Sequence, residues 1–221
     1  MIYLPVTILL FLTLLLFPFI LFSFAIDVVQ VAVAKLGFSP QMALLLLVLV
    51  VLGSTINIPL YRTESQVEIV SDFADLWRRQ FWGIPLQKMR QMTIVALNVG
   101  GGLIPVLLAV YQFRRADSIS ILLVTAIVTL ISYYAAHVVP GIGIQMNPAI
   151  PPLTAALSAT IIAGTQVPAV AFAGGVLGTV IGADLLHLRE LDRMTAGVLS
   201  IGGAGVFDGI ALCGLFALLL S

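Results

Sequence analysis

The sequence predicts an all-α fold: a polytopic transmembrane helix bundle of about six or seven spans, forming one integral membrane domain over residues 1–221. Of the 221 residues, 61% are hydrophobic and only 9% are charged, whereas soluble domains carry roughly 25% charged residues. Apolar stretches long enough to cross a bilayer recur along the chain. Glycine and proline clusters interrupt several of them, which predicts broken or re-entrant segments.

A membrane-spanning helix needs about 20 mostly apolar residues. The first stretch that qualifies lacks the basic start and small-residue cleavage site of a signal peptide, so we expect a retained helix. The fifth is short and follows the "NPAIPP" motif, so it either spans or re-enters, and this choice decides the side of the C-terminus. The stretches lie near residues 2–26, 41–58, 92–113, 118–139, 150–165, 167–188 and 195–220.

Charge gives the orientation and excludes one class of partner. Short cytoplasmic loops are enriched in Lys and Arg. With seven spans, the loops at 59–91 and 189–194 lie on the side of the N-terminus and hold most of the basic residues, so we expect a cytoplasmic N-terminus. Ten basic and ten acidic residues cancel, which leaves no cationic surplus for nucleic acid. The expected surrounding is the lipid bilayer, and the sequence does not set an oligomeric state.

The one sizeable polar piece lies at about 61–90. Its apolar residues fall near one face of a helix and its charged residues fall largely on the other faces, which is typical of an amphipathic helix in the membrane interface. We therefore predict an interfacial loop, with docking of soluble partners as the alternative. The apolar face consists of Phe73, Leu76, Trp77, Phe81 and Ile84.

Two acids lie inside apolar stretches, Asp184 in "GTVIGADLLHL" and Asp208 in "GAGVFDGI". An acid at mid-bilayer costs at least about 2.5 kcal/mol on insertion scales, so both are candidate functional residues. The alternative is a carboxyl group that only hydrogen-bonds helices together. Unbroken helices would separate the two acids by about 15 Å in depth. An unwound glycine-rich segment before Asp208, including Gly205, would reduce that mismatch.

The sixth apolar stretch carries Gly174, Gly178 and Gly182 at four-residue intervals, a pattern typical of close helix packing. Asp184 lies away from this stripe and shares a helix face with His187. His187 either relays a proton for Asp184 or lies at the membrane interface. Neither His187 nor His137 belongs to a ligand motif such as HExxH, so we expect no metal site and no cofactor.

Two further motifs interrupt their helices. "LNVGGGLIPVLL" contains Asn98 and Gly101, and "NPAIPP" contains Asn147, Pro148 and Ala149. Proline removes a backbone donor and blocks the preceding turn, so the second motif cannot be regular helix. Broken helices of this kind hold ions or substrate in transporters. We expect these residues to bind substrate or support the site, with plain kinks as the alternative.

Five segments give the chain a resemblance to a known family: "LGSTINIPLY", "LNVGGGLIPV", "NPAIPPLTA", "GADLLHL" and "GAGVFDGI". Across nearly its whole length the chain resembles a prokaryotic membrane family known as domain of unknown function 1614. The resemblance implies a multi-pass protein of a prokaryotic inner or internal membrane and implies no particular activity.

A second resemblance is local. Intramembrane aspartyl proteases of the presenilin and signal-peptide-peptidase type place one aspartate on each of two adjacent helices, one of them in a G-x-G-D motif, near a P-A-L motif. Gly182–Asp184, Asp208 in "GAGVFDG", and "PAIP" at Pro148 and Ala149 are similar to these elements. The resemblance implies that Asp184 and Asp208 are catalytic and that the substrate is a transmembrane peptide. The chain differs in its G-x-G-x-x-D spacing and in the early position of "PAIP".

Three functions therefore stay open. In an aspartyl protease, two close carboxyl groups share a proton and activate water. In a proton- or ion-coupled transporter or channel for a small solute, each acid works beside a broken helix. In a structural or assembly factor of a membrane complex, the acids only hold helices together. The sequence leaves enzyme activity undecided, and the separation of the two carboxyl groups discriminates between the first two functions.

Overall fold

The computed structural model describes residues 6–68, 88–139, 143–193, 197–203 and 219. The chain divides into two compact units, residues 1–49 and 50–221. The first unit contains α1 (Val6–Lys35) and most of α2 (Pro40–Gly53). All other described elements belong to the second unit.

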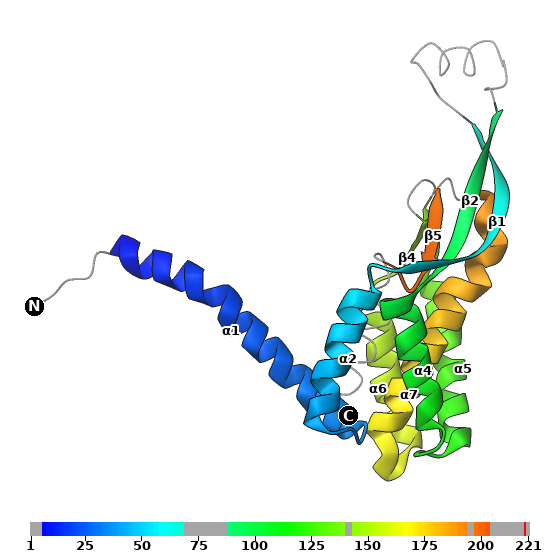
Figure 1. Ribbon diagram of the computed structural model, residues 1–221. Coiled ribbons are helices and arrows are strands. Elements are labelled where there is room, and N and C mark those ends of the chain that lie inside the picture. The colour runs from blue at the N-terminus through cyan, green and yellow to red at the C-terminus, as the bar shows by residue number, and fades with distance from the viewer. Residues whose placement is uncertain (1–5, 69–87, 140–142, 194–196, 204–218, 220–221) are drawn as a thin grey trace, which may run out of the picture. The chain divides into compact units, whose positions relative to one another are not determined.

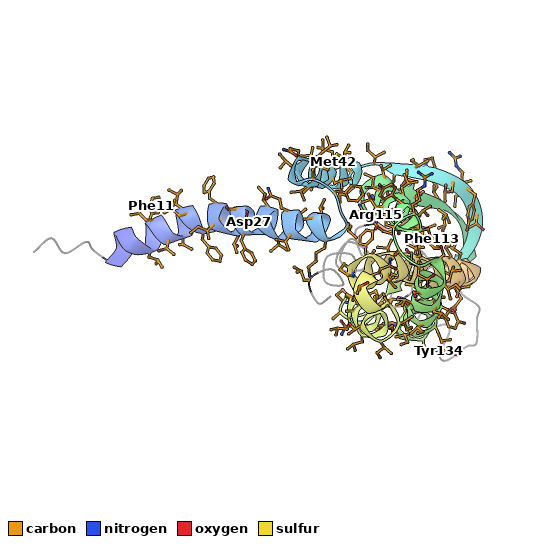
Figure 2. The ribbon with its side chains drawn as sticks, turned by 90° about the horizontal axis from the view of Figure 1, so that it is seen from below. Phe11, Asp27, Met42, Phe113, Arg115 and Tyr134 are labelled. Atoms are coloured by element: carbon orange, nitrogen blue, oxygen red, sulfur yellow. The ribbon has the colours of Figure 1, made fainter. Side chains whose placement is uncertain are left out.

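Helix α1 is apolar on all sides, and large side chains from Leu10 to Phe24 are exposed around it. A helix that is hydrophobic all round is typical of a membrane span. Its 30 residues give a length of about 45 Å, more than the hydrocarbon core of about 30 Å. The predicted end at residue 26 is therefore wrong: the helix continues through Asp27, which lies on it in Figure 2, to Lys35.

Four helices of the second unit pack side by side: α4 (Ile104–Gln112), α5 (Ser118–Ala135), α6 (Ile150–Ile162) and α7 (Val167–Thr179) (Figure 1). Helix α7 is central, because it contacts the other three and is buried throughout 170–176. Helix α5 keeps one face on α7 and turns Tyr134 to the outer surface, as Figure 2 shows.

The predicted glycine stripe is confirmed at the contact between α7 and α5. A β-carbon on Gly174 or Gly178 would lie 2.5–2.6 Å from side-chain atoms of Val124 or Val128, and one on Gly182 would collide with the Thr129 carbonyl oxygen. Real β-carbons do not approach so closely. The two helices can approach this closely only because these three glycines have no side chain.

Strands join this helical core, which the all-α prediction omitted. Strands β1 (Asn57–Glu68) and β2 (Lys88–Asn98) are antiparallel, and β5 (Val198–Ile201) pairs in parallel with residues 94–97 of β2. Pro59 lies in edge strand β1 beside a shift of register, where its missing N–H interrupts no sheet interior. A second, two-stranded sheet pairs β3 (His137–Val139) with β4 (Gly143–Gln145).

These strands correct several predicted boundaries. The stretch predicted to span at 92–113 is strand up to Asn98 and helix only afterwards, and the 195–220 stretch contains strand β5. In the predicted interfacial loop at 61–90, residues 61–68 and 88–90 are strand instead of helix; residues 69–87, which hold the predicted apolar face, lie outside the described residues. The physical reason is long-range pairing: residues 57–68 bond to residues 88–98, and no local apolar pattern records that partner.

Two π-helical turns replace regular α-helix in the second unit. The turn η1 (Val99–Leu103) links β2 to α4, and η3 (Val180–Leu185) extends α7 into the 3-10 segment η4 (Leu186–Arg193). A short 3-10 turn, η2 (Gly164–Gln166), joins α6 to α7. Short π-helical segments frequently occur at functional sites.

Within the described residues, three helices are long and apolar enough to cross a membrane: Leu10–Lys35, Ser118–Ala135 and Gly164–Leu188. Three apolar helices are shorter, at Gln41–Gly53, Val99–Gln112 and Ile150–Ile162. The chain is therefore mostly helical, and its long helices are compatible with a membrane protein.

Candidate functional site

Asp184 lies in the π-helical turn η3, near the end of the apolar helix Gly164–Leu188. Its side chain is buried, with 3% of its surface exposed. Its Oδ2 accepts a hydrogen bond from the backbone N–H of Gly202 at 3.3 Å. Among the described residues this is the only hydrogen bond of the carboxyl group, and no cation pairs with it.

Gly202 follows strand β5 and turns the chain onto Asp184. Its φ of +68° lies in the left-handed region, which favours glycine. A β-carbon here would lie 2.5 Å from the backbone N and Cα of Gly102. The position therefore requires glycine twice, once for its backbone angle and once for its close approach to η1.

Asn98 fixes the other side of this contact. It ends strand β2 and caps η1, because its Oδ1 accepts the N–H of Gly101 at 2.8 Å. Its Nδ2 donates to the Ser54 carbonyl oxygen at 2.7 Å and to Asn57 Oδ1 at 3.2 Å. The Ser200 hydroxyl donates to the same Asn57 oxygen. One amide thus ties the end of β2 to the start of β1 and, through Asn57, to β5.

Glycines bring these backbones together. A β-carbon on Gly100 would collide with the Val50 carbonyl oxygen, and one on Gly101 would collide with the Gly202 carbonyl oxygen. The η1 turn is therefore held between the end of α2 on one side and the Gly202 turn on the other. We call Asn57, Asn98, Gly101, Asp184, Ser200 and Gly202 the Asp184 cluster; its members come from four separate sequence segments.

His187 lies beside the cluster and is buried, with 4% of its surface exposed. Its Nδ1 is 3.1 Å from the Gly182 carbonyl oxygen. A carbonyl oxygen only accepts, so Nδ1 carries a hydrogen and donates it to Gly182. The ring lies over Tyr133 of α5 with centroids 5.0 Å apart. The structure thus buries His187 among protein side chains.

The predicted site residues are only partly brought together. Asp184, Asn98 and Gly101 belong to the cluster, and His187 lies next to it. Asn147, Pro148 and Ala149 are exposed at the start of α6, where Asn147 Oδ1 accepts the Ala149 N–H at 3.0 Å, and among the described residues no hydrogen bond joins them to the cluster. Asp208 and Gly205 lie outside the described residues.

Sequence reasoning missed Asn57, Ser200 and Gly202. Asn57 stands in "LGSTINIPLY", which was already quoted, and Ser200 and Gly202 lie just before "GAGVFDGI". The available signal was a small polar residue next to a glycine or a strand-forming run, which is too common in membrane chains to select these positions. Their role depends on which segments meet, and that is a tertiary property.

The cluster can bind and release a proton at a carboxyl group that is shielded from water. A buried carboxylate without a cation is costly, so its charge state depends on the groups that approach it. Across the described ranges, no group of three or more His, Cys, Asp or Glu residues could hold a metal ion.

Comparison with known proteins identifies a family and no activity. No curated protein and no solved structure matches the chain. A family described as "Protein of unknown function (DUF1614)" matches residues 51–220. That range contains every member of the Asp184 cluster. The chain therefore belongs to this family of unknown function.

Proposed function

We propose that this protein is a proton-coupled membrane transporter or channel in which Asp184 binds the proton. The observation that carries this proposal is the setting of Asp184: a buried carboxyl in the π-helical end of an apolar helix, held by one 3.3 Å hydrogen bond. Acids inside membrane helices mark proton relays and ion pathways. Keeping an acid there without a cation is energetically costly, and this cost indicates that the group has a function.

The proposed membrane arrangement has six or seven segments that cross or re-enter a prokaryotic inner membrane, with a cytoplasmic N-terminus. The three long helices supply full spans. The three shorter ones, of 13 to 14 residues in Gln41–Gly53, Val99–Gln112 and Ile150–Ile162, reach only about 20 Å. Shortened helices of this kind, flanked by irregular backbone, occur beside transport sites.

The glycine turns around Asp184 support a moving site. Gly202 bonds to Asp184 through its backbone, so this contact can open without moving a side chain. When it opens, the carboxyl group loses the Gly202 N–H as its hydrogen-bond donor, and a different group can then bind to it. Proton binding and the position of the Gly202 turn would then be coupled, as a two-state transport cycle requires.

The test is proton flux into vesicles that contain the purified protein and a pH-sensitive dye. Asp184→Asn keeps the shape of the side chain and cannot ionise, so flux should fall at least about tenfold, within the range that acid–base groups contribute to a reaction. Asp117→Asn makes the same chemical change in an exposed loop and should leave flux within about twofold. Unchanged flux in Asp184→Asn, with normal folding, would refute the proposal.

Intramembrane proteolysis is the second candidate, favoured by one observation. The hydrogen bond between Gly202 and Asp184 returns the chain to Asp184 six residues before Asp208. Six residues cover about 9 Å as a helix and about 20 Å when extended, so the chain between Gly202 and Asp208 is short enough for the two acids to approach each other. A transmembrane peptide cleaved by the native protein, but not by Asp184→Asn or Asp208→Asn, would establish this activity. If neither assay responds, the role of an assembly factor is left.

A further inference from the structure

Two polar side chains in the helical core have no hydrogen-bond partner among the described residues. Neither the Ser132 hydroxyl on α5 nor the two amide atoms of Gln112 at the end of α4 finds one. Both residues are completely buried. An unsatisfied buried polar group costs about 1–3 kcal/mol, so each of these positions needs a partner that the helices do not provide.

Ser132 lies at the Asp184 end of the core. A β-carbon on Gly182 would be 3.0 Å from the Ser132 β-carbon, which places Ser132 directly against the π-helical turn that carries Asp184. The next residue, Tyr133, contacts the His187 ring. The unpartnered hydroxyl is therefore on the residue of α5 that packs against the helical turn containing Asp184.

Gln112 lies at the opposite end. Its carbonyl oxygen accepts the Arg115 N–H at 2.9 Å, and Gln166 bonds to the backbone of Arg115 and Asp117, so Gln112 is about one turn from the level of Gln166. The 18 residues from Gln166 to Asp184 cover about 27 Å at helical rise. This is close to the hydrocarbon thickness of about 30 Å.

Between the two ends, the α5–α7 contact contains two buried hydroxyl groups, Thr125 and Thr179. Thr125 is one of the neighbours of Gly174 and Gly178 and lies seven residues before Ser132, on the same face of α5. Each threonine hydroxyl donates to a carbonyl of its own helix, at 2.7–2.8 Å. Polar groups thus recur along an otherwise apolar interface.

We propose that Ser132 and Gln112 are the two hydration points of a proton route through the α4–α5–α7 core, with Asp184 at one end. Water is the smallest partner that can both donate and accept at a hydroxyl and a carboxamide. The inference deepens the proposed function, since it names the route that serves Asp184.

The chemistry of the route requires no co-reactant. In each transfer, one O–H bond of a protonated water breaks as another forms on the next oxygen, and the last transfer places the proton on the Asp184 carboxylate. The glycine stripe keeps α5 and α7 in close contact in this structure. Water must therefore enter when the helices separate briefly, and the route conducts only then.

Cysteine labelling tests the route without measuring transport. Cys213 is the single cysteine, so Cys213→Ala gives a background without thiols. In that background, Ser132→Cys and Gln112→Cys should react with a small water-soluble methanethiosulfonate in membrane vesicles. Ala155→Cys and Ala159→Cys on α6 are matched controls, because both alanines are completely buried, carry no polar group and lie on a helix outside the proposed route. They should label at least about tenfold more slowly.

Labelling at both test positions supports the route, and labelling at neither or at only one overturns it. Flux separates this inference from the proposed function. Gln112→Leu and Ser132→Ala should each lower flux several-fold without loss of thermal stability, because they remove unsatisfied polar groups. If Asp184→Asn abolishes flux but these two variants do not change it, the route is wrong and the role of Asp184 stands. If Asp184→Asn leaves flux unchanged, the proposed function fails, whatever the labelling shows.

Discussion

The contact between Gly202 and η1 gives the most specific stability prediction, because one methyl group meets two separate penalties there. Alanine at φ +68° costs about 1–2 kcal/mol in backbone strain. Its β-carbon would also lie 2.5 Å from the Gly102 backbone, which cannot rotate away as a side chain could. Overpacking of this kind costs about 1–3 kcal/mol. Gly202→Ala should therefore lower the free energy of unfolding by about 2–5 kcal/mol.

Two other glycines separate the penalties. Gly164 has φ +55°, and a β-carbon added there would meet no atom within 4 Å, so Gly164→Ala tests backbone strain alone and should cost about 1–2 kcal/mol. Gly197 has neither a positive φ nor a close neighbour, so Gly197→Ala should change stability by less than about 0.5 kcal/mol. The three variants form a graded series.

The assay is thermal unfolding of the purified proteins in one detergent, followed by circular dichroism. In a chain of this size, 1 kcal/mol shifts Tm by about 2–4 °C. Gly202→Ala should thus unfold about 4–20 °C below the native protein and clearly below Gly164→Ala. Equal shifts for these two variants would show that Gly202 does not approach Gly102 closely and would refute the packing of the Asp184 cluster.

Two further predictions concern side chains that hold the second unit together. Asn98→Ala should cost about 2–3 kcal/mol, because it removes the cap on Gly101 and the bond to Ser54; a loss below about 0.5 kcal/mol in denaturant unfolding would contradict this. Two hydrogen bonds from Ser120 hold the pKa of Asp117 below its ordinary value. The bond from the hydroxyl group has the larger effect, and the bond from the backbone N–H has the smaller one. A depressed pKa contributes stability above the unfolded-state pKa that is lost as pH falls through the folded-state pKa. Asp117→Asn should therefore flatten the dependence of Tm on pH below about pH 4, and identical profiles would exclude this coupling.

Local patterns predicted those parts of the fold whose partners are encoded by composition or spacing. The glycines of α7 at four-residue intervals predicted a close helix contact, and the apolar run before Leu188 predicted a long helix. Residues 198–201, in the segment for which the sequence left both a helix and an unwound backbone open, form a strand. The strand ends of the predicted spans could not be foreseen, because β1 and β5 depend on pairing with β2.

The candidate site divides in the same way. Sequence alone singled out Asp184, because an acid inside an apolar stretch is energetically costly. It singled out Asn98 and Gly101, because they belong to a glycine-rich motif that interrupts an apolar stretch. It gave no reason to place Asn57, Ser200 or Gly202 with them. Tertiary structure decided that, because hydrogen bonds and backbone contacts between distant segments form only when glycine lets their main chains approach within a few ångströms.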